Sequence, residues 1–338
     1  MRTAALLLAY AAALGWVVDP VLARSRTLRR HPGAGLWLWH GVALGSLAAV
    51  AAALFLLAHD VAEHGFVWGF RADKALVHDA YASPGEVPAV WNVALLPLVV
   101  GFALMGVAAV RRWRAAHNES RAHRLGVEFS RPVAAAGGRE LLVGIHRSAV
   151  PAIYCVARGS CDQRILATTG ALRLLDEQQL QAAVEHERAH VVAHHHAMGV
   201  LADSVSSVAR WLGMLRNYPR AVRALMELQA DDVAARHHGP TTVAAALLEM
   251  GAAGTAFVST TAASLGGDDV AARIRRLLHG EPAKHHGASK MMAIGAATAL
   301  LTVPVTSSLT PAMLVSGTAR TSHEEPPSRS PGGFAHHP

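Results

Sequence analysis

Apolar residues gather in four long runs, and these runs dominate the pattern of the 338-residue chain. The runs cover residues 3–22, 35–58, 87–110 and 289–317, and charged residues are rare within them. Each run has about the length of roughly 20 residues that an α-helix needs to cross a bilayer. The pattern therefore predicts a mainly α membrane protein, with three transmembrane helices in residues 1–110 and one C-terminal transmembrane helix.

Arginines cluster on one side of the predicted spans. Four follow the first run and five follow the third, namely Arg24, Arg26, Arg29, Arg30, Arg111, Arg112, Arg114, Arg121 and Arg124. Because Lys and Arg are enriched in cytoplasmic loops, we expect a multi-pass protein of the cell membrane with both clusters inside. Residues 111–288 then form a cytoplasmic domain, whereas the N-terminus, the loop 59–86 and the C-terminal tail lie outside. The arginines also argue against a second interpretation of the first run, a cleaved signal peptide ending at "VLA".

The composition agrees with a membrane protein, since 52% of residues are hydrophobic and 16% are charged. A net charge of +7 could indicate nucleic acid as a partner. Arginines beside membrane spans are better explained by contact with anionic lipid, so we expect the bilayer as a partner and no direct binding of nucleic acid. We interpret the two cysteines, Cys155 and Cys161, as structural or incidental.

The cytoplasmic segment has the pattern of an α+β domain with a small sheet. Strand-like stretches cover residues 139–146, 151–157 and 163–169. A helix is expected over residues 177–198, with Asp176 as N-cap and Gln179 completing a capping box. A later helix over residues 219–238 should end at Gly239. Residues 318–338 are rich in Pro, Ser and Gly and are expected to be a disordered tail.

The stretch "HERAH" within the first helix has the pattern H-E-x-x-H, formed by His186, Glu187 and His190. Two histidines four residues apart lie on one helix face, so both can bind one zinc ion. The glutamate beside the first histidine can reach a water molecule on that ion. The sequence therefore predicts one Zn²⁺ per chain, with Glu187 as the catalytic base.

A third ligand is needed, and the sequence offers two schemes. His196 has the spacing of the third histidine in metzincins, but Ala193 stands where that motif has a glycine, and alanine should prolong the helix and carry His196 away. Glu227 lies about forty residues downstream, with Asp231 four residues later on the same face. We favour Glu227 as the ligand, with Asp231 accepting the Nδ1 hydrogen of a ligating histidine.

The sequence "TTGALRLLDEQQLQAAVEHERAH", followed by "ELQADDVAARHHG", resembles the BlaR/MecR antirepressor family of membrane zinc metallopeptidases, which is related to HtpX and the CAAX prenyl proteases. The resemblance covers about residues 110–280. It implies a gluzincin-like protease domain in which His186, His190 and Glu227 match the zinc ligands and Glu187 the catalytic glutamate.

The resemblance also implies a protein substrate, and in the sensor members this is a DNA-binding transcriptional repressor in the cytoplasm. Those members carry an extracellular penicillin-binding sensor domain after the last span, where this chain has about twenty residues. We therefore expect no such sensor domain, and the activating signal stays open. Two alternatives remain, a membrane-protein quality-control protease of the HtpX type and a non-catalytic zinc-binding membrane receptor.

The predicted reaction is hydrolysis of a peptide bond by zinc-activated water, with Glu187 transferring the proton to the leaving amine. Arg236, His237 and His238 are the candidates for stabilising the oxyanion. The strand over residues 163–169 could add an extended substrate at its edge. We interpret His194–His196 as a polar helix end, because their position along the helix keeps them from the metal.

Overall fold

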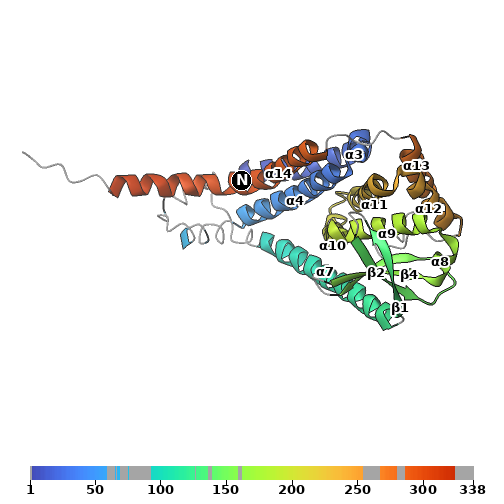
Figure 1. Cartoon of the computed structure of the whole chain (residues 1–338). Coiled ribbons are helices and arrows are strands. Elements are labelled where there is room, and N and C mark those ends of the chain that lie inside the picture. The colour runs from blue at the N-terminus through green and yellow to red at the C-terminus, as the bar shows by residue number, and fades with distance from the viewer. Residues whose placement is uncertain are drawn as a thin grey trace, which may run out of the picture. The chain divides into compact units, whose positions relative to one another are not determined.

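The computed structural model describes residues 2–58, 65, 67–68, 75, 93–125, 127–135, 139–158, 162–253, 267–279 and 286–323. Within these residues the protein is mostly helical and has one small mixed sheet (Figure 1). The chain divides into two compact units. One consists of Met1–Ala11, Ala48–Val99 and Thr302–Pro338, and the other of Ala12–Leu47 and Val100–Leu301. The sheet and the predicted site belong to the second unit.

Four helical segments are long and apolar enough to cross a membrane: Arg2–Ala23, Pro32–Leu57, Leu95–Ala115 and Ser289–Leu309. The first consists of α1 (Arg2–Ala12), the π-helical turn η1 (Ala13–Val18) and α2 (Asp19–Ala23), and the short α3 (Arg26–Arg30) follows it. The others are α4 (Pro32–Leu57) and parts of α7 (Leu95–Leu125) and α14 (His286–His323). All four coincide with predicted spans, which supports a membrane protein.

The helix boundaries differ from the prediction at two places. Residues 87–92 of the third predicted span lie outside the described residues, and α7 is described from Leu95 and continues through the arginines to Leu125. The last helix extends to His323, six residues into the predicted tail. The remainder of that tail and most of the predicted loop 59–86 lie outside the described residues.

The sheet has four strands in the order β1-β2-β4-β3, namely β1 (Val127–Ala135), β2 (Arg139–His146), β3 (Ile153–Arg158) and β4 (Asp162–Thr168). β1 pairs antiparallel with β2 and β3 with β4, whereas β2 and β4 are parallel. The sequence analysis missed β1, which contains Pro132; proline is tolerated on an edge strand. The proposal that residues 163–169 offer a free edge is wrong, because β4 lies between β2 and β3. Among the described strands, the edge on that side of the sheet belongs to β3.

The core of the second unit lies between the sheet and the helices α9 (Glu177–Val192) and α12 (Pro240–Ala252). Its buried residues include Val143, Ile145, Ile153, Leu180, Val184, Leu247 and Met250. A close turn leads from β4 into α8 (Thr169–Leu174), where a Cβ atom on Gly170 would lie 2.4 Å from the carbonyl oxygen of Ala149. Only glycine fits this close approach of α8 to the backbone that joins β2 and β3.

The predicted capping box of α9 is confirmed, since Asp176 Oδ1 accepts from Gln179 N and Gln179 Oε1 accepts from Asp176 N. The prediction that α9 continues to residue 198 is wrong. α9 ends at Val192, and His194 adopts a left-handed conformation with φ 54°. Histidine is among the non-glycine residues enriched in this conformation.

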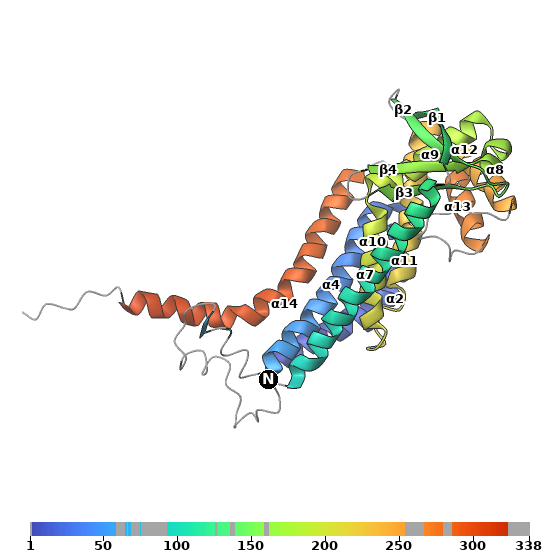
Figure 2. The same ribbon diagram turned by 90° about the horizontal axis from the view of Figure 1, so that it is seen from below.

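After this break α10 (His195–Ala209) begins, and it runs antiparallel beside α11 (Tyr218–His238), as Figure 2 shows. α11 ends at Gly239 as predicted. The last helix of the second unit's folded domain, α13 (Gly267–His279), contacts α11 and α12. α9, α10, α11 and α13 thus all supply residues around the predicted metal site.

Candidate metal centre

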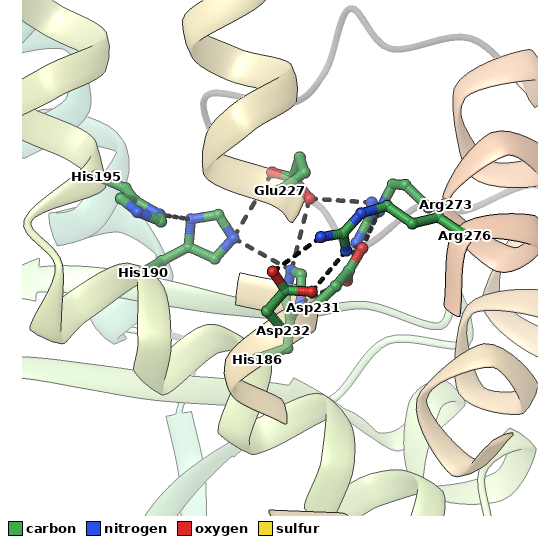
Figure 3. Close-up of polar contacts among 8 residues, drawn as sticks. All are labelled: His186, His190, His195, Glu227, Asp231, Asp232, Arg273 and Arg276. Carbon is green, nitrogen blue, oxygen red and sulfur yellow. Dashed lines mark hydrogen bonds and ion pairs between the residues drawn. The ribbon is translucent and has the colours of Figure 1, made fainter. Parts of the chain in front are cut away.

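His186, His190 and Glu227 lie together, and all three side chains are buried. His186 Nε2 is 3.1 Å from His190 Nε2 and 3.5 Å from Glu227 Oε2, while His190 Nε2 is 3.6 Å from Glu227 Oε1. Figure 3 shows these three side chains converging from α9 and α11. The structure therefore brings together the three residues that the second scheme selected as ligands.

The spacing of these atoms fits a zinc ion. Ligand atoms around a tetrahedral zinc, with bonds of about 2.0–2.1 Å, lie about 3.3 Å apart. The Nε2 atoms of the two histidines are 3.1 Å apart, close to this value, and one ligand atom from each of the three residues lies within 4.8 Å of the others. Two imidazole nitrogens and one carboxylate oxygen also form a donor set typical of catalytic zinc, which leaves a fourth position for water or substrate.

Glu187 follows His186 on α9 and interacts electrostatically with His186 and Glu227. Its side chain is buried, and its Oε1 atom has no hydrogen-bond partner among the described residues. Its carboxylate interacts with the backbone N–H of Cys155 on β3. Burial is the main cause that raises the pKa of Glu187 to about 7. A carboxylate with a pKa near neutrality can both accept and return a proton.

Asp231 supports His186 from the far side of the ring. Its Oδ1 atom lies 3.1 Å from His186 Nδ1, so it can accept the Nδ1 hydrogen and leave Nε2 free for a metal. This is the arrangement predicted from the four-residue spacing of Glu227 and Asp231 on α11. Neither acid points to solvent, since both side chains are buried.

Arg273, on α13, links the two acids and was not predicted from the sequence. Its Nε and Nη2 atoms donate to the two oxygens of Asp231, both at 2.7 Å, and its Nη1 atom lies 3.0 Å from Glu227 Oε2. The guanidinium is itself buried. A second pair lies one helical turn further along α13, where Arg276 donates to both oxygens of Asp232 at 2.6 and 2.9 Å. Two two-pronged ion pairs therefore join α13 to the helix that carries Glu227.

His195 supports His190 and was also missed. Its Nδ1 atom is 2.9 Å from His190 Nδ1, and its Nε2 atom is 3.2 Å from Gln229 Oε1. The amide oxygen of Gln229 can only accept, so His195 carries its hydrogen on Nε2 and accepts at Nδ1. His190 then donates from Nδ1 and presents Nε2 to the metal position. The interpretation of His195 as part of a polar helix end is wrong, because its exposed fraction is 1%.

The two histidine ligands differ in their electrostatic surroundings. Burial alone would lower the pKa of His186, but its hydrogen bonds to Asp231 and Glu227 and the charges of both acids raise it to about 9. Burial lowers the pKa of His190 to about 3. Burial acts to raise the pKa of Glu227, yet the charge of Arg273 outweighs it, and the pKa falls to about 2. Without a metal the acids thus favour a proton on His186, and a metal ion must replace that proton to bind.

The other predicted residues lie elsewhere. His196 is partly buried and does not belong to the His186, His190 and Glu227 cluster. Arg236, His237 and His238 form the last turn of α11, where His237 Nε2 lies 4.0 Å from Glu185 Oε1. Glu185 also binds Arg188, and it neighbours His186 in sequence but not on the same helix face. The oxyanion role of these three residues stays a prediction.

A signal for Arg273 and Arg276 was present in the sequence. The two arginines stand three apart in "DDVAARIRRLL", a spacing that puts both on one helix face, and Asp231 and Asp232 are adjacent in "ELQADD". Their pairing could have been guessed from matching charges, although not its place in space. His195 gave no comparable signal, because its approach to His190 depends on the break at His194.

Comparison with known proteins agrees with this geometry. Residues 116–274 match peptidase family M48, a family of zinc-dependent peptidases. A 74-residue stretch is 35% identical to the protease HtpX homolog of Methanothermobacter thermautotrophicus, covering 22% of this chain and 29% of that relative. The match thus spans less than a third of the relative's length. No solved structure matches the chain. These similarities support a membrane metallopeptidase, whereas membership of the BlaR/MecR group stays a prediction.

Replacing Glu227 should remove the metal. We expect Glu227→Ala to lose zinc, because two neutral histidines remain as ligands and Arg273 is left without one of its acids. His196→Ala and Glu249→Ala, a change of an exposed acid on α12, should keep about one zinc per chain. Elemental analysis of the purified full-length variants checks this. Loss of zinc from the His196 variant alone would contradict the ligand assignment.

Replacing His195 should weaken zinc binding without abolishing it. His195→Ala removes the group that fixes the tautomer of His190, and losses of such partners typically cost about 10- to 100-fold in metal affinity. His195→Asn should recover part of the loss, since its amide oxygen can accept from His190 Nδ1. Competition with a fluorescent chelator measures the affinity, and His196→Ala is the control. Equal affinities of the alanine and asparagine variants, both as stable as the parent, would argue against this role.

Proposed function

We propose that this protein is an integral-membrane, zinc-dependent endopeptidase. The observation that carries the proposal is the buried cluster of His186, His190 and Glu227. Glu187 lies beside His186 on α9, and its Oε1 atom has no hydrogen-bond partner among the described residues. The match of residues 116–274 to peptidase family M48 supports it independently. We further propose that residues 111–288 lie on the cytoplasmic side, as the arginines at the ends of the apolar helices favour.

A zinc ion bound to this cluster would act as a Lewis acid that polarises the scissile carbonyl and lowers the pKa of water. Side chains of the protein orient the metal ligands and transfer the proton. Asp231 and His195 hold the Nδ1 sides of the two imidazole rings, which leaves both Nε2 atoms available to bind a metal. Glu187 accepts the proton of the attacking water at its carboxylate and returns it to the nitrogen of the leaving amine, which breaks the peptide bond.

The free edge of β3 is the best candidate for binding an extended substrate. β3 is paired only with β4 among the described strands, and the backbone N–H of Cys155 on β3 interacts with Glu187. A peptide that adds to this edge as a further strand would run past the catalytic glutamate. The contact between β3 and α9 supports this placement of the substrate.

The natural substrate is proposed to be a protein, and two classes compete. The resemblance to antirepressor proteases favours a cytoplasmic DNA-binding repressor, cleaved in signalling. The similarity to an HtpX homolog favours membrane proteins, cleaved in quality control. A non-catalytic zinc receptor is less well supported, because a metal-binding role alone needs no buried carboxylate at Glu187 beside the open position.

Replacing Glu187 should abolish hydrolysis while zinc stays bound. Glu187→Gln keeps the shape of the side chain but removes its basicity, and loss of a general base typically costs about 10²- to 10⁴-fold in rate. The measurement is cleavage of an unfolded protein by the full-length chain in nanodiscs, together with its zinc content. Glu249→Gln serves as control. A parent protein that binds zinc and cleaves nothing would favour the receptor.

The same variant can identify the substrate. Expressed in cells and purified by an affinity tag, Glu187→Gln should retain proteins that the active enzyme would cleave. Enrichment of a DNA-binding repressor supports signalling, and enrichment of unassembled membrane proteins supports quality control.

A further inference from the structure

The last residues of α10 and the turn that leads into α11, residues 208–217, expose two large apolar side chains. We call this segment the hairpin tip. Trp211 is 84% exposed and Leu212 is 43% exposed, whereas the neighbouring Met214 and Leu215 are buried. If all of residues 111–288 lay in the cytoplasm, as predicted from the arginines, this exposed tryptophan and leucine would both face water. Neighbouring exposed apolar side chains often mark a contact with a partner or a membrane.

The buried side of the hairpin tip packs on the first apolar helix. A Cβ atom on Gly15 would lie 2.4 Å from Met214 Cε, and Leu215 N donates to Gly15 O at 3.3 Å. One turn later Asn217 Nδ2 donates to Asp19 Oδ2 at 2.7 Å. Gly15 lies nine residues before Arg24, a distance of about 13 Å along a helix. The tip therefore lies well inside the apolar part of this helix.

The third apolar helix indicates the same depth. A Cβ atom on Gly101 would lie 3.7 Å from Val208 Cγ1, at the start of the hairpin tip. Gly101 stands ten residues before Arg111, or about 15 Å along α7. This distance is about half the roughly 30 Å thickness of a hydrocarbon core. Two apolar helices thus independently put the tip at a similar level.

Contacts with the second apolar helix show that α11 runs from the level of the tip toward the N-terminal end of α4. The ring of Tyr218, at the start of α11, lies 6.2 Å from that of Trp39, which is seven residues or about 10 Å into α4. Further along α11, Leu225 and Gln229 approach Gly35 and Gly33 in the first turn of α4. Glu227, between them, is therefore level with the polar end of this helix.

From these contacts we propose that the hairpin tip is inserted in the lipid bilayer, with Trp211 and Leu212 in contact with lipid. The metal cluster at the other end of α10 and α11 is then fixed at the membrane surface. Tryptophan and leucine side chains both gain free energy when they leave water for the bilayer. If the proposed peptidase activity holds, the scissile bonds of natural substrates must lie near the membrane surface.

Arg210 and Arg216 flank the two apolar residues and are both exposed. Arginines near the ends of membrane-inserted segments extend their guanidinium groups to the phosphates while their methylene chains stay in apolar surroundings. Because a charged arginine at the centre of the hydrocarbon core is costly, these two residues limit the hairpin tip to one leaflet. The hairpin is too short to span, since α10 has 15 residues.

The proposal can be tested without any assay of activity. In a Cys155→Ser, Cys161→Ser background, single cysteines replace Trp211 or Leu212 in the full-length chain, and each is spin-labelled in lipid nanodiscs. Collisions with oxygen, which concentrates in lipid, are compared with collisions with a water-soluble nickel chelate. Phe102→Cys, 57% exposed on α7, is the lipid control, and Leu248→Cys, 59% exposed on α12, is the water control.

Labels at 211 and 212 should collide more often with oxygen than with nickel, as at 102, while the label at 248 shows the reverse. Nickel accessibility at both tip positions equal to that at 248, in monodisperse protein, would overturn the proposal. The protein labelled at 212 keeps Trp211, so it reports the environment of the tip independently of any displacement that a change at 211 causes. Hydrolysis and zinc content do not enter this measurement, so failure of the proposed function would not affect its outcome.

Discussion

The site depends on the buried ion pair between Asp231 and Arg273 and on the contact of Asp231 with His186. Asp231 contacts His186 on one side and the guanidinium of Arg273 on the other, and thereby joins α9, α11 and α13. Arg273 also reaches Glu227, so one cation balances both buried acids. A charge buried without a partner is strongly destabilising, and removing one member of this network leaves the others uncompensated. The cluster of His186, His190 and Glu227 is thus positioned by compensation of charge.

The second histidine depends on a different kind of support. His190 is oriented by neutral groups, His195 and Gln229, and the low pKa values of the two histidines, about 3 and about 4, follow mainly from burial. One ring is therefore held by charge and the other by a chain of neutral hydrogen bonds. In both arrangements the Nδ1 atom has a polar partner and the Nε2 atom points toward Glu227. Only His186 has an acid as its Nδ1 partner, so a cation that binds here has to displace the proton of one histidine and not of two.

The helices that build the site also extend along the apolar helices. α11 carries Glu227 and Asp231 in its middle and contacts α4 at Leu225, while its first residue contacts Trp39. Asp19, buried within the first apolar segment, is paired with Asn217. A polar group in such surroundings is costly unless it finds a partner, so this pair fixes the approach of the hairpin to the apolar helix. The position of the site relative to the apolar helices follows from these contacts.

The four apolar helices, three of the four strands and the capped helix α9 could be predicted from the sequence, and so could the candidate site residues His186, Glu187, His190, Glu227 and Asp231. These features depend on local periodicity and on fixed spacings along one helix, which do not change with the tertiary contacts of the segment. Three features could be seen only in the folded chain: β3 forms an edge of the sheet among the described strands, α9 breaks at His194, and His195 and Arg273 reach the site. These depend on which surfaces meet, and a left-handed histidine or a buried arginine becomes favourable only when distant segments satisfy its hydrogen bonds and charge.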